Sequence, residues 1–319
     1  MMLIEATPLA ESSDAFEHAN QSAALVHATL SRRLAACGAM AGDASLAADF
    51  AAAYDDAADS ALAAVGDLVD AFAACGRLTS ATLTNHGHAE NRSLISGRTV
   101  FTATPCVAGY VAVLPCSLPS SLGGDLSSLP GWASWILDRV EGFVWPDADV
   151  PRLREAAAAW RDASHQVADL RSFCSSAVRS FSLLRSPELP IAIDVTDSMA
   201  SRCQSVADQC SALSRSCDGY ADQVEEHRAE ILDLVQDLLR DAVIIDGIGI
   251  VLGALTAGVT AEAALAVNAA RIAAAAPRLI RIVESLRTVA SACAAPVRLA
   301  GEALRDVRAE LAVFRRVRI

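Results

Sequence analysis

The chain has 319 residues, of which 53% are hydrophobic and only 5% aromatic, and its formal net charge at pH 7 is −12. Alanine is abundant among the hydrophobic residues; it favours helix but buries little area. This composition indicates long paired helices and disfavours sandwiches and enzyme cores built on aromatic clusters.

The charge is unevenly distributed along the chain. Residues after 270 carry a balance of +6, so the first 270 residues carry −18. An acidic body argues against nucleic-acid binding, which requires a basic footprint. The basic C-terminal stretch suits an anionic membrane surface, an acidic partner or a solvated helix face.

Residues 1–91 are predicted to form a first helical hairpin. One apolar stripe covers residues 8–37 and a second begins at Phe50, both with three- and four-residue spacing. A glycine-bounded turn at residues 38–43 separates them, and its Asp43 is a candidate cap for the second helix. We expect that helix to end near residues 85–87.

Polar residues of this hairpin have competing interpretations. His86 and His88 form an HxH pair, but they flank a glycine near the expected helix end, which favours a polar cap over a metal site. The cluster Asp55, Asp56 and Asp59 is interpreted as the solvated face of the second helix.

Residues 92–130 differ in character and are predicted to be a proline- and glycine-rich connector that packs across the helices. Pro105 and Pro115 limit any strand between them. Cys106 and Cys116 would close a loop by a disulfide in an oxidising compartment, but free thiols are the favoured interpretation.

Residues 131–241 are predicted to form a second hairpin, and they contain all four tryptophans of the chain. Trp132 and Trp135 suggest a short amphipathic helix docked on the bundle, with a chance of facing a partner. Trp145 lies at the joint before a helix with Asp149 as N-cap and a proline in its first turn. Trp160 is predicted to anchor the apolar face of that helix, which ends near residues 184–190.

The return helix of this hairpin has the most regular pattern in the chain. Its apolar residues repeat every seven positions, with companions three positions later, and such a seam requires a helical partner. We predict a packing or partner-binding seam at Cys203, Val206, Cys210, Leu213, Cys217 and Tyr220. The cysteines are too far apart along one helix to pair with each other, and His227 on the same seam is expected to be buried and neutral.

Residues 242–319 are predicted to contain an apolar hairpin followed by basic helices. The stretch 242–261 is long enough to cross a bilayer, and its small residues would allow close helix contact. Asp246 opposes a permanent span, so a soluble or conditionally inserted hairpin is favoured. The possible membrane-contact residues are Gly247, Gly249, Gly253 and Gly258, and the following helices, 262–290 and 293–317, are expected to be split near Pro296.

The sequence lacks the motifs that carry most catalytic chemistry. No phosphate-binding loop, dinucleotide fingerprint, nucleophile elbow or HExxH zinc motif stands where it would be expected, and the cysteines form no CxxC pair. We therefore predict a non-catalytic protein without cofactor or metal. The N-terminus also lacks the basic start and apolar core of a signal peptide.

The block WPDADVPRLREAAAAWRDASHQVADL, residues 145–170, resembles the WXG100-like N-terminal regions of actinobacterial type VII-secreted polymorphic toxins. The segment LAACGAMAGDASLAADFAAAYDDAADSAL, residues 34–62, is similar to the hairpin at the front of such toxins. Two features depart from the family pattern: neither predicted turn keeps Trp-x-Gly, and no acid stands four residues after Tyr54 or Tyr220.

The resemblance implies an all-α helical bundle that serves as a secretion-targeting module. Its implied partners are a small WXG100-family protein, which would supply the missing export signal, and the type VII secretion machinery. The implied route is synthesis in the cytoplasm, then secretion or cell-surface display without a signal peptide. The alternatives are a membrane-inserting or channel-forming domain that uses residues 242–261, and an unrecognised enzyme.

Overall fold

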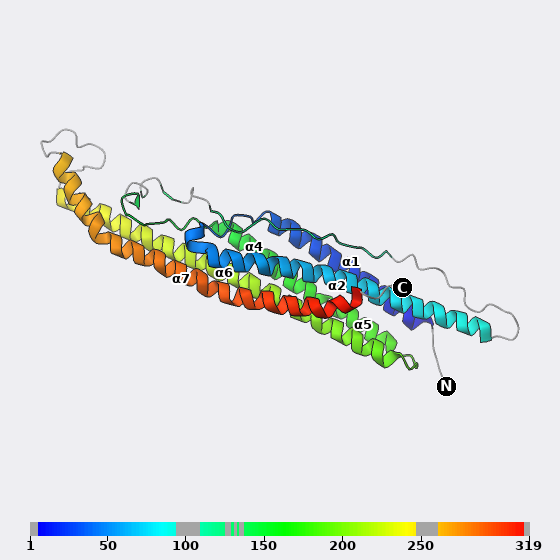
Figure 1. Cartoon of the computed structure of the whole chain (residues 1–319). Coiled ribbons are helices and arrows are strands. Elements are labelled where there is room, and N and C mark those ends of the chain that lie inside the picture. Colours follow the sequence, from blue (N-terminus) through cyan, green and yellow to red (C-terminus); the bar gives the residue numbers. More distant parts are fainter. Residues whose placement is uncertain are drawn as a thin grey trace.

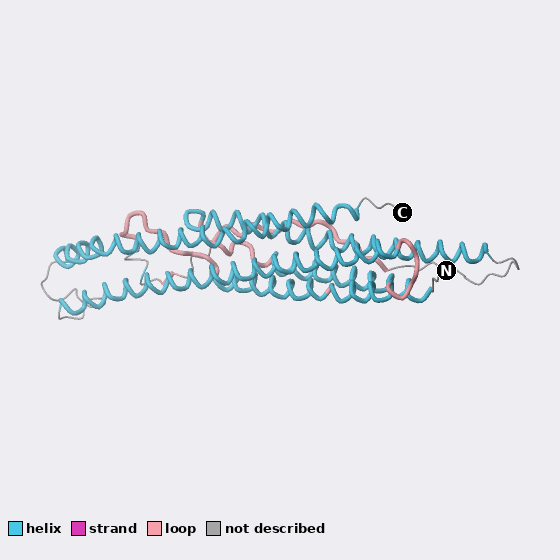
Figure 2. The backbone as a smooth tube through the Cα atoms, turned by 90° about the horizontal axis from the view of Figure 1, so that it is seen from below, coloured by secondary structure: helices cyan, strands magenta, loops and turns pink. Residues whose placement is uncertain are grey.

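The computed structural model describes residues 6–93, 109–124, 129–130, 133, 137–246 and 261–315. Within these residues the fold is an elongated bundle of long helices (Figures 1 and 2), which confirms the predicted all-α class. Its helices are α1 (Ala6–Ala35), α2 (Ala44–Ser93), α4 (Val150–Asp169), α5 (Arg171–Phe181), α6 (Leu189–Asp246) and α7 (Ala261–Arg315).

Helices α1 and α2 form the predicted first hairpin. Ala39 and Gly42 adopt positive φ angles of 57° and 101° in the turn between them. The Asp43 side chain accepts a hydrogen bond from the Ser45 amide at 2.8 Å, so Asp43 caps α2 as expected.

Helix α2 is longer than predicted, because it continues through Gly87 to Ser93. His86 is therefore not a helix-end cap. Its Nε2 lies 2.8 Å from Oε1 of Glu188, just before α6, so it joins the far ends of α2 and α6.

The second hairpin consists of α4 and α5 on one side and α6 on the other. Asp149 is the N-cap of α4, accepting a hydrogen bond from the Arg152 amide at 3.0 Å, and a proline lies in the first turn, as predicted. Leu170 separates α4 from α5, yet its φ of −58° and ψ of −24° are nearly helical, so the two helices form one kinked arm.

The two hairpins pack on each other as a four-helix bundle. Helix α1 contacts α4 and α5 as well as α2, and α6 contacts α2 as well as α4 and α5. The largest buried side chains come from both hairpins, including Phe16, Phe50, Trp160 and Tyr220. Over most of the described length, the apolar stripes of the two hairpins are thus covered from within the same chain.

Helix α7 lies in the groove between α2 and α6 and contacts both along much of its length (Figure 1). It runs parallel to α2, with Arg287 bonding to the Ser45 carbonyl and Arg308 paired with Asp67. Gly301 permits a close approach to α2, because an added Cβ would lie only 3.3 Å from the Ala57 Cβ.

The predicted split of this helix near Pro296 is wrong, because α7 continues through both Pro277 and Pro296. Both prolines are exposed, and so is Ala292, four residues before Pro296. The carbonyl that loses its helical partner can therefore be hydrated, while the buried face of α7 keeps the helix in place.

The proposed domain division at residue 241 falls inside α6, which runs to Asp246, and the division stays a prediction. The four glycines at 247, 249, 253 and 258 lie outside the described residues. Among the helices that the structure does describe, none combines the length and apolar character needed to span a bilayer.

Residues 109–124 form an extended strap along the first hairpin. Asn20, fully buried in α1, brackets the backbone of Val111: its Nδ2 donates to the Val111 carbonyl at 3.0 Å and its Oδ1 accepts from the Val111 amide at 2.7 Å. The same Nδ2 donates to the Val69 carbonyl of α2 at 2.9 Å. One amide side chain therefore joins both helices of the hairpin to the strap.

Candidate interaction site at the tryptophan junction

Three non-helical segments meet beside the α1–α2 turn, and together we name them the tryptophan junction. They are the turn at residues 37–43, the end of the strap at residues 118–124 and the entry to α4 at residues 145–149. The region includes the start of the sequence block that carries the family resemblance, so the tryptophan junction is the candidate functional site.

The entry to α4 is held by Arg228 of α6. Its Nε donates to the Pro146 carbonyl at 2.7 Å, and its Nη2 donates to the Ala148 carbonyl at 2.6 Å. The guanidinium also lies over the Trp145 ring, 5.8 Å from the centroid. A planar group with several fixed donors suits this task in a way that a lysine ammonium does not.

The two aspartates of the junction connect α4 to the α1–α2 turn. Asp147 is buried and its Oδ1 accepts from the Asp43 amide at 2.7 Å. The Asp149 amide donates to the Met40 carbonyl at 2.9 Å. Gly124 of the strap has no space for a side chain, because an added Cβ would overlap the Asp147 carboxylate.

The strap pairs with the turn through backbone hydrogen bonds. The Ala39 amide donates to Ser120, the Ala41 amide to Ser121, and Gly42 and Gly123 exchange two bonds of 2.6 and 3.0 Å. Gly123 has a φ of 128°, which a residue with a side chain rarely adopts. The α1–α2 turn is thus covered by the strap.

Aromatic residues form the floor of the junction. Trp160 is fully buried and its Nε1 donates to the Tyr54 hydroxyl at 3.0 Å. The Tyr220 hydroxyl donates to the Ala41 carbonyl at 3.0 Å, and its ring stacks on Phe50 with centroids 4.4 Å apart. These contacts tie α2, α4 and α6 to the turn.

Burial keeps two tyrosines and one cysteine of this region neutral. It raises the pKa of Tyr54 well above its ordinary value and raises that of Tyr220, so both hydroxyls remain donors. Burial also raises the pKa of the Cys37 thiol to about 11. A nucleophilic cysteine requires the opposite shift, so Cys37 is not poised for catalysis.

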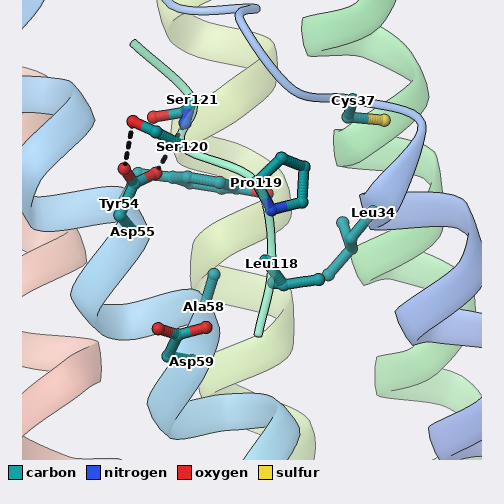
Figure 3. Close-up of a pocket in the computed structure, with 10 residues that line it drawn as sticks. All are labelled: Leu34, Cys37, Tyr54, Asp55, Ala58, Asp59, Leu118, Pro119, Ser120 and Ser121. Atoms are coloured by element: carbon teal, nitrogen blue, oxygen red, sulfur yellow. Dashed lines mark hydrogen bonds between the residues drawn. The ribbon is translucent and has the colours of Figure 1, made fainter. Parts of the chain in front are cut away.

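A small cavity of about 170 Å³ lies between α1, α2 and the strap (Figure 3). Asp55 points to the strap, where its two oxygens accept from the Ser120 hydroxyl at 2.8 Å and the Ser121 amide at 2.9 Å. Asp56 pairs instead with Arg305 of α7. The predicted solvated face of α2 therefore holds both the strap and α7, and Asp59 lines the cavity wall.

No described residues form a cluster of three or more potential metal ligands. The polar groups of the junction are bonded to backbone or to each other and converge on no common point. The arrangement organises helices around a joint, and nothing in its geometry supplies an acid, a base and a nucleophile within reach of one substrate.

The structure places the predicted seam residues inside the chain. Cys203, Val206, Cys210, Leu213, Cys217 and Tyr220 are all at most 1% exposed, against α4, α5 and their neighbours. Trp145 and Trp160 are buried as well, whereas Trp132, Trp135 and Cys106 lie outside the described residues. His227 is buried, and its Nδ1 donates to the Gln223 carbonyl at 2.7 Å.

Sequence reasoning missed Arg228 and Asn20, which hold the junction and the strap. Asn20 is a polar residue within the apolar stripe of α1, and this interruption could have indicated a buried hydrogen-bonding role. Two glycines within α2 could have indicated that another segment packs on this helix. Gly76 makes room for Tyr110 of the strap, and Gly66 makes room for Val113. Nothing local in the sequence distinguishes Arg228 from the exposed arginines near it.

This long-helix fold, with a joint between two hairpins, defines an all-α helical bundle. Residues 128–279 match the family described as WXG100 like domain, a range that includes α4, α5, α6 and the first part of α7. The chain therefore carries a WXG100-like domain of the kind found in the N-terminal regions of type VII secretion toxins, as the resemblance implied.

Three curated relatives support this assignment. The chain is 30% identical over 213 residues to the outer membrane channel protein CpnT of Mycobacterium tuberculosis and of Mycobacterium bovis, which is 66% of this chain and 24% of that protein. It is 32% identical over 163 residues to the putative NAD(+)–arginine ADP-ribosyltransferase Mav of Mycobacterium avium, which is 49% of this chain and 19% of that protein.

The aligned part thus spans about a quarter of the length of the CpnT proteins. No solved structure matches the chain.

Proposed function

We propose that this chain is a non-catalytic targeting and interaction module of a type VII secretion substrate, exported together with a small WXG100-family partner. The observation that carries the proposal is that the WXG100-like match at residues 128–279 includes the second hairpin, formed by α4, α5 and α6. The tryptophan junction joins this hairpin to the first one. Relatives whose names denote a channel and an ADP-ribosyltransferase align with this chain over only 24% and 19% of their own lengths, which supports a common delivery role rather than a common activity.

The covered seams shape how such a module would be recognised. The apolar stripes of both hairpins are already buried against each other and against α7. A secretion component or partner would then meet the outer surface of a folded bundle. We propose that the module travels with its own helices packed, so that the small partner contributes the export signal and not the missing half of a core.

An export assay tests this proposal. The chain is fused to a reporter and expressed in an actinobacterial host with an active type VII system and in an isogenic strain whose system is inactivated. We expect the reporter outside the cell only in the first strain. Retention in both strains, or release from both, would contradict the proposed function.

Two variants of the fusion sharpen the test. Deletion of residues 149–184 removes α4 and α5 and should abolish export. Because that deletion also uncovers α6, the exposed substitution Leu299→Asp serves as a folded control, since Leu299 is 67% exposed on α7. Normal export of the deletion would show that the second hairpin is not the targeting element.

A second candidate function is membrane insertion, favoured by the name of the CpnT relatives and by the apolar stretch 242–261 between α6 and α7. Leakage of a trapped dye from anionic vesicles measures it. Permeabilisation that is lost after substitution of Gly253 and Gly258 by aspartate would support insertion. Intact vesicles at micromolar protein would remove this candidate.

A further inference from the structure

An apolar groove of about 340 Å³ lies at the end of the bundle where α2 ends and α6 begins. Its walls are formed by Leu78 and Thr82 of α2 and by Ile191 and Val195 of α6. Its floor contains core side chains of the other helices: Leu9, Phe16, Cys75 and Phe181. Leu78 is 41% and Ile191 67% exposed, so large apolar side chains face water here.

The groove continues the seam that α7 fills. Along α7 the residues Leu304, Val307 and Leu311 are buried between α2 and α6. Near the end of α7, Arg308 pairs with Asp67, and Arg202 pairs with Glu310. Since α7 runs parallel to α2 and antiparallel to α6, the next turns along its axis lead toward residues 75–82 and 189–196.

Within the described residues this seam is uncovered, and it is built from the same two helices as the seam that accepts α7. Successive turns of α2 and α6 supply its walls, as they do beneath α7, and the polar atoms at its surface are few: two threonine hydroxyls of α2, Thr196 and the Glu188 carboxylate. A small molecule would need convergent polar groups to fix its orientation. An amphipathic helix needs only aliphatic residues at intervals of three and four.

The acidic residues beside the groove indicate which charge a docked helix would carry. Glu188 stands at its end, where it is paired with His86, and Asp194 is exposed on the α6 side. Beneath α7 the same kind of seam is flanked by acids of α2, and α7 meets them with Arg305 and Arg308. A helix that docks in the groove would be expected to carry basic residues on its flanks.

We propose that this groove docks an amphipathic helix of a partner protein, with an aliphatic seam and basic flanks, as a continuation of α7. The inference concerns a surface and goes beyond the proposed function, because it holds for any partner that presents such a helix. His86 and Glu188, 2.8 Å apart, close the outer end of the docking surface.

The last helical turns of α7 provide a probe of the right chemistry. A synthetic peptide of residues 297–315, with blocked ends and a fluorescent label, is titrated with the full chain while anisotropy is followed. Ile191→Asp is the test variant, and Leu299→Asp is its matched control. The side chains of Ile191 and Leu299 are both 67% exposed, but of the two only Ile191 lines the groove.

We expect saturable binding that Ile191→Asp weakens about tenfold or more, since the substitution removes apolar contact area and would bury a charge beneath the peptide. Leu299→Asp should leave the affinity unchanged. No saturable binding, or equal weakening by both variants, would overturn the proposal.

A photo-crosslinking group in the peptide shows where it binds. Crosslinks to residues 75–82 and 188–196 would support the groove. Crosslinks confined to residues 57–72 would mean that the peptide replaces α7 in its own seam, and that result would also overturn the proposal. Because this experiment measures binding alone, its outcome is independent of whether the fusion is exported.

Discussion

Arg228 offers the sharpest test of how the tryptophan junction is held. Replacing it by alanine removes two hydrogen bonds, at 2.7 and 2.6 Å, and leaves the carbonyls of Pro146 and Ala148 without their donor. A hydrogen bond to a charged group contributes about 1.5–3 kcal/mol, and the contact with the Trp145 ring adds about 0.5–1 kcal/mol. Because Arg228 is only partly buried and the terms overlap, we expect a loss of about 2–3 kcal/mol.

Urea unfolding followed by circular dichroism measures this loss. Arg215→Ala is the matched control, because Arg215 is exposed on the same helix and its side chain bonds only to Ser211, one turn earlier. Arg228→Lys keeps the charge but cannot hold two carbonyls and a ring at once, so it should recover less than half of the stability. If Arg228→Ala and Arg215→Ala differed by less than about 0.5 kcal/mol, the clamp would have no energetic role.

The remaining predictions concern the core, the strap and alkaline pH. Trp160→Phe and Tyr54→Phe should show a coupling of about 1 kcal/mol in a double-mutant cycle, and additive losses would contradict their buried hydrogen bond. Asn20→Ala should cost about 2–4 kcal/mol and expose residues 109–124 to limited proteolysis, because three backbone bonds lose their partner; an unchanged cleavage rate would show that the strap is held by other contacts. Burial raises the pKa of the Cys210 thiol to about 12 from an ordinary 9.0, so its contribution to stability is complete below pH 9 and is lost as the pH rises toward 12. The urea midpoint should therefore fall above pH 9, and Cys210→Ala should flatten that fall; an identical pH slope in the variant would refute the assignment.

The geometry of the junction also explains how the α1–α2 turn is ordered without a tryptophan. The turn is fixed by the strap, by Asp147 and by the Tyr220 hydroxyl. Each of these groups comes from a distant part of the chain. A tryptophan at the turn is then unnecessary, because the order that it would impose locally is supplied by tertiary contacts.

The helices and the faces that they bury follow from local sequence patterns. Period and capping are local properties, so the stripes of the two hairpins, the N-cap at Asp149 and the seam from Cys203 to Tyr220 were readable without coordinates. The lack of catalytic motifs and the family block at residues 145–170 likewise predicted a secretion-targeting module from the sequence.

Which seams cover each other depends on long-range packing and could not be predicted from local patterns. Similar apolar stripes can pair within one chain or with a partner, and the choice depends on contacts between residues far apart in sequence. Arg228 bonds to residues about 80 positions earlier, and Asn20 bonds to Val111. The continuity of α7 past Pro296 was decided in the same manner, because the burial of its inner face in the α2–α6 groove outweighs the local preference of proline to end a helix.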